Sequence, residues 1–310
     1  MENLIEFRNI DVKFRLGKLT IHALKGINLE LRRGEVLGLV GESGSGKSVL
    51  IHSVFRTLPD DAVFSGEIIY KGVNLLSMDE KKAMKLIGKN FSLVPQGFGS
   101  LNPVLKSWLQ IMERPMEHFG FKKDEAYRVS KDLLKKLFLE DPEKIASAYR
   151  HQLSGGMLQR VLVAMGISGK TEAIFFDEPT KGLDTITKKI LLELLKLARS
   201  MTESMLVVSH DLEFIERIAD RIAVIHRGEI VEISEAKEFF ENPKHPYSRM
   251  LIDSAPSKGL KKCFDKIDFN SEGCSYHPIC QRAREICKIN KPSWIKLENS
   301  GLRCLVDIWK

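Results

Sequence analysis

The chain has 310 residues, of which 43% are apolar, and a formal net charge of +7. This length exceeds the usual size of one domain, so we expect one large domain and a smaller appendage. No apolar run approaches the roughly 18 residues of a membrane-spanning helix, and no segment is expected to cross a membrane. The basic residues are scattered along the chain, which favours a solvated surface over a nucleic-acid or acidic-membrane partner.

Export and disulfide bonding are both disfavoured by the sequence. The N-terminal stretch Met1–Phe7 has no basic segment followed by an apolar one, so we expect a protein of the reducing cytoplasm. The chain has five cysteines, and all of them follow residue 262. In a reducing compartment this clustering indicates metal or cluster ligation before disulfide bonds.

The strongest motif is Gly41-Glu-Ser-Gly-Ser-Gly-Lys47-Ser48, a complete P-loop. It lies between the apolar runs 36–40 and 49–54, which predict a buried strand before it and a helix start after it. In that context backbone N–H groups surround phosphates, and the helix N-terminus faces negative charge. Lys47 would reach the β- and γ-phosphates of a nucleotide, and Ser48 would hold Mg²⁺.

Short β-runs surround this motif. Residues 3–33 alternate apolar and polar side chains, which predicts antiparallel strands flanking the P-loop strand. Within them Phe14 is placed to stack on an adenine ring, although a packed core phenylalanine explains it equally well. Residues 65–72 are typical of a hairpin strand and its turn.

Gln96 follows the short apolar strand 91–94, which Pro95 ends. Its amide oxygen is of the type that Mg²⁺ accepts, so Gln96 could bind the metal and sense the γ-phosphate. Taken alone, a polar residue after a strand is usually just a loop residue, and Gln96 gains weight only from the motifs that follow it. Residues 104–150 then show helical periodicity broken by proline and glycine, at Pro115, Gly120 and Pro142.

A second glycine-rich helix start is found at Leu153-Ser-Gly-Gly-Met-Leu-Gln159. Ser154 is suited to cap the helix, and the two glycines allow a backbone or a phosphate to come close. One nucleotide cannot reach this helix start and the P-loop of the same subunit. We therefore expect a head-to-tail pair in which each chain offers this helix to the ATP on the other's P-loop.

Two further strand ends carry polar side chains. The apolar strand 173–176 ends in Asp177 and Glu178, where one carboxylate can hold Mg²⁺ and the next can polarise the attacking water. Asp184 follows in a turn. The strand 205–208 precedes His210, for which a γ-phosphate contact is favoured because ligands bind at the carboxyl ends of parallel strands.

Taken in order, these motifs resemble the ATPase subunits of ABC transporters, over residues 1 to about 250. The resemblance implies an α/β P-loop NTPase with a mixed, largely parallel sheet core, an antiparallel β subdomain and a helical subdomain at about 97–165. It implies that Glu178 is the general base and His210 the switch histidine, with Lys47 and Gln96 as further catalytic residues.

The same resemblance implies a set of ligands for ATP and Mg²⁺. The chain's own P-loop side would supply Phe14, Gly41, Ser43, Gly44, Gly46, Lys47, Ser48, Val49, Gln96 and Asp177. Of these, Mg²⁺ would be held by Ser48, Gln96 and Asp177. The residues offered in trans would be Ser154, Gly155, Gly156, Gln159 and Asp184.

Two segments narrow the resemblance. Ser100-Leu-Asn-Pro103 and the stretch 242–251 are similar to the dipeptide, oligopeptide and nickel uptake branch, although Gln96-Gly-Phe-Gly99 departs from its more usual Gln-Asp-Pro run. The resemblance implies a second, homologous ATPase chain, or a homodimer in isolation. It also implies two integral permease subunits, an extracytoplasmic substrate-binding protein, a location on the cytoplasmic face of the membrane, and no nucleic acid.

Residues 251–310 resemble the C-terminal extension of that branch, where four cysteines can hold a [4Fe–4S] cluster. The matching positions are Cys274, Cys280, Cys287 and Cys304, and Cys263 is left over. Four thiolates suit iron–sulfur or zinc, but the gaps here are wider than the knuckles of structural zinc sites. A tail without metal is the third alternative.

Two other functions share parts of this pattern. A nickel or metal-chelate importer would have every one of the ATPase motifs. A soluble ABC ATPase acting on nucleic acid would suit the basic balance and the cysteine tail. Such proteins usually carry two cassettes or long coiled-coil insertions, whereas this chain has one cassette and a short insertion.

Overall fold

A computed structural model describes residues 2–17, 19–254, 272–297 and 300–306. The chain forms two compact units, which we call unit 1 and unit 2. Unit 1 consists of Met1–Glu2, Arg32–Val36 and Leu76–Val208. Unit 2 consists of Asn3–Leu31, Leu37–Leu75 and Ser209–Lys310.

Unit 1 is built on three parallel strands. They are β6 (Phe91–Val94), β7 (Thr171–Asp177) and β8 (Thr202–Ser209), with β7 in the middle. Val94 pairs with Phe176 and Asp177 with Val208, so the strands end at the same edge. The apolar runs predicted as buried strands are thus confirmed, because a parallel strand covered on both faces needs apolar side chains on both.

The helices of unit 1 largely follow the predicted helical stretch. They are α2 (Glu80–Asn90), α3 (Ser107–Phe119), α4 (Lys123–Lys136), α5 (Pro142–Ser147), α6 (Gly155–Ile167) and α7 (Thr185–Met201), with the 3₁₀ turns η1 (Phe98–Ser100) and η2 (Arg150–Gln152).

Two of the three expected helix breaks occur. Gly120 ends α3 with a left-handed φ of 73°, and Pro142 begins α5. The prediction that Pro115 breaks the helix is wrong, because Pro115 lies inside α3. A single missing N–H is tolerated there, since Ile111 and Met112 on the same helix are completely buried.

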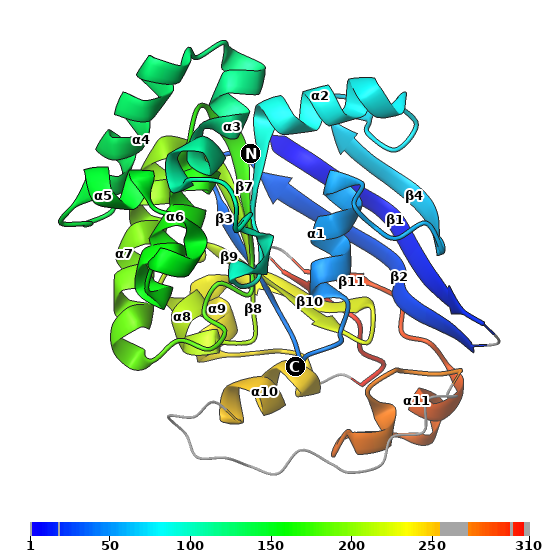
Figure 1. Cartoon of the computed structure of the whole chain (residues 1–310). Helices are drawn as coiled ribbons and strands as arrows, with labels where there is room; N and C mark the ends of the chain where they lie inside the picture. The colour runs from blue at the N-terminus through cyan, green and yellow to red at the C-terminus, as the bar shows by residue number, and fades with distance from the viewer. Residues whose placement is uncertain (1, 18, 255–271, 298–299, 307–310) are drawn as a thin grey trace. The chain divides into compact units, whose positions relative to one another are not determined.

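Unit 2 contains an antiparallel sheet in the strand order β2-β1-β4-β5 (Figure 1). Its members are β1 (Asn3–Leu16), β2 (Leu19–Arg32), β4 (Ala62–Tyr70) and β5 (Val73–Asn74). The hairpin predicted at residues 65–72 corresponds to β4 and its turn into β5. The alternating pattern of β2 fits a sheet with one exposed face.

A second group of strands in unit 2 has the order β11-β12-β10-β9-β3. These are β3 (Val36–Val40), β9 (Arg221–His226), β10 (Glu229–Glu235), β11 (Ile295–Lys296) and β12 (Gly301–Leu302). The prediction that the strands of residues 3–33 flank the P-loop strand is wrong. Within unit 2, β3 pairs in parallel with β9, because an entirely apolar strand belongs in a sheet covered on both faces.

The helices of unit 2 are short and follow its strands. They are α1 (Lys47–Phe55), α8 (Leu212–Glu216), α9 (Ala236–Glu241), α10 (Pro246–Asp253) and α11 (Glu285–Ile289), with the 3₁₀ turn η4 (His277–Ile279). The C-terminal part joins this unit through β12, whose Leu302 pairs with Glu232 of β10.

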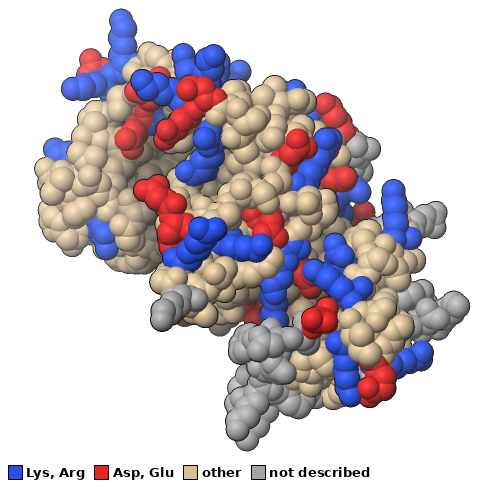
Figure 2. All heavy atoms as spheres, turned by 90° about the vertical axis from the view of Figure 1, so that its right-hand side faces the viewer, with Lys and Arg blue, Asp and Glu red and all other residues tan. Residues whose placement is uncertain are grey.

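Charged side chains of both signs share the surface. On the face shown in Figure 2, acidic side chains lie among the basic ones. In the part of the chain that the structure describes, no helix is both long and apolar enough to reach across a bilayer.

Arg114 of α3 is the main polar tie inside unit 1. Its guanidinium donates to the carbonyl of Gly88 at 2.8 Å, of Lys89 at 3.1 Å and of Lys170 at 2.8 Å, and also to that of Ser168. Burial lowers the pKa of Arg114 to about 10, so the group stays charged at neutral pH.

We predict that Arg114→Met lowers the free energy of unfolding by about 2–3 kcal/mol, because several carbonyls lose their donor. Urea denaturation followed by circular dichroism measures the change. The matched control is Arg8→Met, because Arg8 is exposed and pairs with the surface carboxylates of Glu6 and Glu67; its effect should be much smaller than that of Arg114→Met. Equal effects of the two substitutions would contradict the role given to Arg114.

Candidate nucleotide-binding site

The P-loop begins where β3 ends, in a position without room for a side chain. A Cβ at Gly41 would overlap the carbonyl oxygen of Ile225 on the neighbouring strand β9. Gly46, with φ 108°, immediately precedes α1, and no side chain of the described residues caps the helix there. An uncapped helix start behind a tight glycine turn is the geometry that binds phosphate.

Lys47 is buried at the first position of α1. Its ammonium donates to the carbonyl of Gly41 at 2.8 Å and to that of Glu42 at 2.9 Å. The lysine therefore lies along the inside of its own loop. Ser43 and Gly44 are exposed at the outer turn, whereas Ser48 and Val49 are half-buried on α1.

Unit 1 carries a second group of predicted site residues at one edge of its strands. Asp177 ends β7, and Gln96 follows β6 by two residues, so the parallel pairing brings them to the same edge. Glu178 has a left-handed φ of 46°, and its N–H donates to the carbonyl of Val208 at 2.9 Å. A non-glycine residue held in this region is strained and fixed in direction, as is common at functional sites.

The second glycine-rich helix start, predicted at residues 153–159, is the start of α6 at the surface of unit 1. Ser154 caps it by accepting the N–H of Met157 at 3.4 Å, and Ser154 and Gly155 are exposed. Gly156 is half-buried, and Gln159 is buried, where its amide donates to the carbonyl of Pro179 at 3.2 Å. The N-cap prediction for Ser154 is confirmed.

Asp184 caps the next helix, α7. Its carboxylate accepts the N–H groups of Ile186 and Thr187, both at 2.9 Å. The hydrogen bonds from Thr187 lower the pKa of Asp184, so the carboxylate is ionised at neutral pH.

Phe14 and His210 are two further predicted site residues. Phe14 is half-buried on β1, opposite Ala62 of β4. His210 is exposed and follows Ser209, the last residue of β8. The structure thus gathers the residues from Gly41 to Val49 in unit 2, and Gln96, Asp177 and Glu178 in unit 1.

The cysteine-rich tail is described from residue 272, so Cys263 lies outside the described residues. Cys287 and Cys304 are buried in an apolar cluster with Leu302 and Val306, and Cys274 packs against it. Burial raises the pKa of the Cys274 thiol to about 11, and the neighbouring thiols of Cys304, Cys287 and Cys280 add to the rise. The four thiols are therefore close enough to repel one another when ionised.

Backbone N–H groups also point at these sulfur atoms. Arg284 donates to the sulfur of Cys287 at 3.5 Å. The amides of Tyr276, Arg282 and Val306 bond in the same way to Cys274, Cys280 and Cys304. Among the described residues, however, no three His, Cys, Asp or Glu side chains are grouped as ligands of a single metal ion. The predicted cluster thus remains a proposal.

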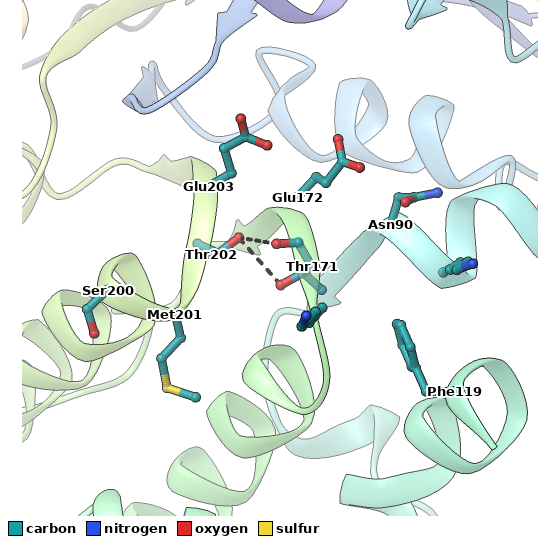
Figure 3. A pocket seen from close by; sticks show the side chains of 10 residues that line it. Asn90, Phe119, Thr171, Glu172, Ser200, Met201, Thr202 and Glu203 are labelled. Atoms are coloured by element: carbon teal, nitrogen blue, oxygen red, sulfur yellow. Dashed lines mark hydrogen bonds between the residues drawn. The ribbon is translucent and has the colours of Figure 1, made fainter. Parts of the chain in front are cut away.

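A cavity of about 540 Å³ lies at the other end of the unit 1 strands (Figure 3). Thr171 and Thr202, at the starts of β7 and β8, line it and hydrogen-bond to each other. Nucleotides bind at the carboxyl ends of such strands, so this cavity is not a candidate for ATP.

Tyr247 contacts the P-loop, and the sequence did not predict this contact. The N–H of Glu42 donates to the hydroxyl of Tyr247 at 3.0 Å, across 205 residues of chain. The sequence marked Tyr247 only as part of a stretch typical of a transporter branch. No local pattern could have paired it with the loop.

Fold and motifs together define an ATP-binding cassette ATPase. The family model described as "ABC transporter" matches residues 24–181, and the model described as "Oligopeptide/dipeptide transporter, C-terminal region" matches residues 231–287. The chain therefore belongs to the ABC transporter ATP-binding subunits, in the oligopeptide/dipeptide branch.

Named relatives and a solved structure support the same family membership. The dipeptide transport ATP-binding protein DppD of Caldanaerobacter subterraneus subsp. tengcongensis is 35% identical, over 97% of this chain and 96% of that protein. The oligopeptide transport ATP-binding protein AppD of Bacillus subtilis is 34% identical, over 99% of this chain and 97% of its own. Among solved structures, the ATP-binding cassette MJ0796, a dimer bound to ADP and phosphate, superposes with a TM-score of 0.67 at 27% identity. The match covers 75% of this chain and 98% of that one.

We predict that Gly41→Ala raises the dissociation constant for ATP by roughly tenfold or more, because the added methyl group would displace the loop from the Ile225 carbonyl. Titration with a fluorescent ATP analogue measures the effect. Gly99→Ala is the control, since a Cβ at Gly99 would meet nothing within 4 Å. Unchanged binding by the Gly41 variant would contradict the steric role of this glycine.

Proposed function

We propose that the chain energises the uptake of di- or oligopeptides through separate membrane subunits. It is the ATP-hydrolysing subunit of a peptide ABC importer, and it uses ATP and Mg²⁺. The observation that carries this function is the uncapped, glycine-turned start of α1, in a chain whose relatives of almost equal length are named as peptide transport ATP-binding proteins.

In the proposed site each residue acts through charge and position. Lys47 would turn from its loop carbonyls to the β- and γ-phosphates, and Ser48 would bind Mg²⁺. Gln96 and Asp177 would complete the Mg²⁺ environment. Glu178, fixed by its bond to Val208, would take the proton of the attacking water.

The second half of the site would come from another chain. Ser154 accepts a backbone N–H, so its hydroxyl hydrogen can still be donated to a phosphate oxygen. The exposure of Ser154 and Gly155 supports this role, and so does Ile186, a large apolar side chain that is 74% exposed two residues after Asp184. The partner would be a homologous ATPase chain or a second copy.

The loop between η1 and α3 supports contact with a membrane subunit. Val104 is 73% exposed and Leu105 is 36% exposed, in the loop that precedes α3. Two adjacent exposed apolar side chains suit a protein partner better than water. We infer that this loop meets a permease subunit at the cytoplasmic face of the membrane, with the extracytoplasmic binding protein beyond it.

We predict that Glu178→Gln lowers the rate of ATP hydrolysis about 10²- to 10⁴-fold and leaves ATP affinity within about twofold, because only the general base is lost. Phosphate release and nucleotide titration measure the two effects. In the presence of Mg²⁺ and ATP, size-exclusion chromatography should show this variant trapped as a pair of chains.

The exposed acid Glu193 of α7 provides the matched control, and Glu193→Gln should hydrolyse ATP at the wild-type rate. Full turnover by the Glu178 variant would refute the assignment of the base.

The chain would divide into an ATPase domain at residues 1–250, with the helical subdomain at about 97–165, and a C-terminal extension at 251–310. In the extension Cys274, Cys280, Cys287 and Cys304 would hold a [4Fe–4S] cluster. The chemistry of the donor set supports this proposal, because four thiols lie in one small region and the N–H of Arg284 donates to the sulfur of Cys287 at 3.5 Å. Among the described residues, however, the four thiols are not grouped around a single metal position. The bound cluster would supply positive iron centres that offset the repulsion between buried thiolates.

We predict about four iron and four sulfide ions per chain after anaerobic purification, measured by chemical analysis and visible absorption. Cys274→Ser should lose the absorption, whereas Cys263→Ser should keep it. A full-length chain that binds one zinc ion, or no metal, would overturn the cluster and leave the ATPase assignment intact.

A further inference from the structure

Tyr247 is a buried side chain that joins the P-loop to the cysteine-rich tail within unit 2. It is completely buried near the start of α10, and its hydroxyl accepts the N–H of Glu42. Glu42 is the second residue of the P-loop. The other polar contacts of the loop show what this hydrogen bond adds.

Hydrogen bonds within the loop, and one from the hairpin between β9 and β10, hold the first turn of the loop. The carbonyl of Glu42 accepts the N–H of Ser45 at 3.2 Å and the ammonium of Lys47 at 2.9 Å. The carbonyl of Ser45 accepts the N–H of Gly228 at 2.9 Å, from the hairpin between β9 and β10. Gly228 holds the loop at Ser45, near its end, whereas Tyr247 holds it at Glu42, near its beginning. The two contacts therefore fix the loop from outside at two different places.

Tyr247 itself is rigidly placed. Its N–H donates to Nδ1 of His245, and the carboxylate of Glu232 accepts the N–H groups of Lys244 at 2.9 Å and His245 at 2.7 Å. Pro246 at the first position of α10 fixes the backbone further. A side chain anchored in this way can hold a loop without paying much ordering entropy.

The tail packs directly on this tyrosine. The ring of Tyr276 lies 5.3 Å from that of Tyr247 and 5.4 Å from that of His226, and the rings of His226 and Tyr247 are 4.3 Å apart. Burial lowers the pKa of His226 to about 4, so its ring packs against the two tyrosines as a neutral imidazole at pH 7. Tyr276 is two residues after Cys274, and its N–H bonds to that sulfur.

We propose that Tyr247 is a positioning residue for ATP binding, and that the tail segment Cys274–Tyr276 holds Tyr247 in place against the P-loop. The proposal rests on ATP binding at the P-loop, which belongs to the proposed function, and it does not depend on an iron–sulfur cluster. Loss of the hydroxyl leaves the entrance of the loop less ordered before binding. ATP affinity then falls, while the chemical step, which other residues perform, is unchanged.

The test compares Tyr247→Phe with the wild-type full-length chain. We expect the dissociation constant and the KM for ATP to rise about 3- to 10-fold, the size of one lost hydrogen bond, with kcat within about twofold. The matched control is Tyr127→Phe, which removes a hydroxyl that bonds Ser147 in unit 1. It should change neither constant.

A second variant, at Tyr276, tests whether the tail holds Tyr247 in place. Tyr276→Ala should raise the dissociation constant for ATP in the same direction. The double variant Tyr247→Phe/Tyr276→Ala should bind ATP no more weakly than the weaker single variant, because both substitutions act through one bond. Additive losses would overturn the connection between tail and loop.

The remaining outcomes separate this proposal from the function itself. Wild-type chain that binds no ATP would refute the proposed function. Wild-type chain that binds ATP with the same affinity as Tyr247→Phe would overturn only the role of Tyr247. A fall in kcat with unchanged KM would overturn it as well, since positioning of the loop should act on binding.

Discussion

The nucleotide site depends on the close approach of two parallel strands, β3 and β9. Where β3 ends, the carbonyl of Ile225 leaves no space for a side chain at Gly41, so the chain must turn at once into the P-loop. The same strand β9 continues into His226 and the hairpin at Gly228, whose N–H holds the middle of the loop. Much of the loop's shape is therefore imposed by residues that are not part of its motif.

Local patterns explain what the sequence could predict. The glycine turn, the apolar strand before it and the helix after it involve neighbours in the chain, and so do the caps at Ser154 and Asp184. Each follows from steric freedom or from the hydrogen bonds of a helix end. The motif residues were for the same reason found in the elements expected of them.

Pairings between distant segments were not predictable in this way. The alternation of residues 3–33 gives strands but not their sheet, and the structure pairs β1 with β4 rather than with β3. Tyr247 meets Glu42 only because the chain returns to the P-loop after 205 residues. At Pro115 the local pattern predicted a break that does not occur. The buried side chains of α3 stabilise the helix more than the proline destabilises it.

The tail combines both kinds of information. The resemblance to a transporter branch implied which four cysteines belong together, while the structure adds the burial of Cys287 and Cys304, the raised pKa of Cys274 and the N–H group that Arg284 directs at the sulfur of Cys287. Buried thiols with raised pKa values are poor ligands until a cation compensates the charge. The packing of Tyr276 on Tyr247 gives this small region a physical connection to the nucleotide loop.

The central claim is that one nucleotide is held between the P-loop of one chain and the α6 start of another. Electron cryo-microscopy of the assembled transporter, trapped with Mg²⁺, ADP and vanadate, tests it most directly. Lys47 of this chain should contact a nucleotide that is also contacted by the serine equivalent to Ser154 in the opposing ATPase, and Ser154 of this chain should contact the nucleotide on that partner. A trapped complex in which Lys47 and Ser154 of the same chain meet one nucleotide, or in which Ser154 meets none, would contradict it.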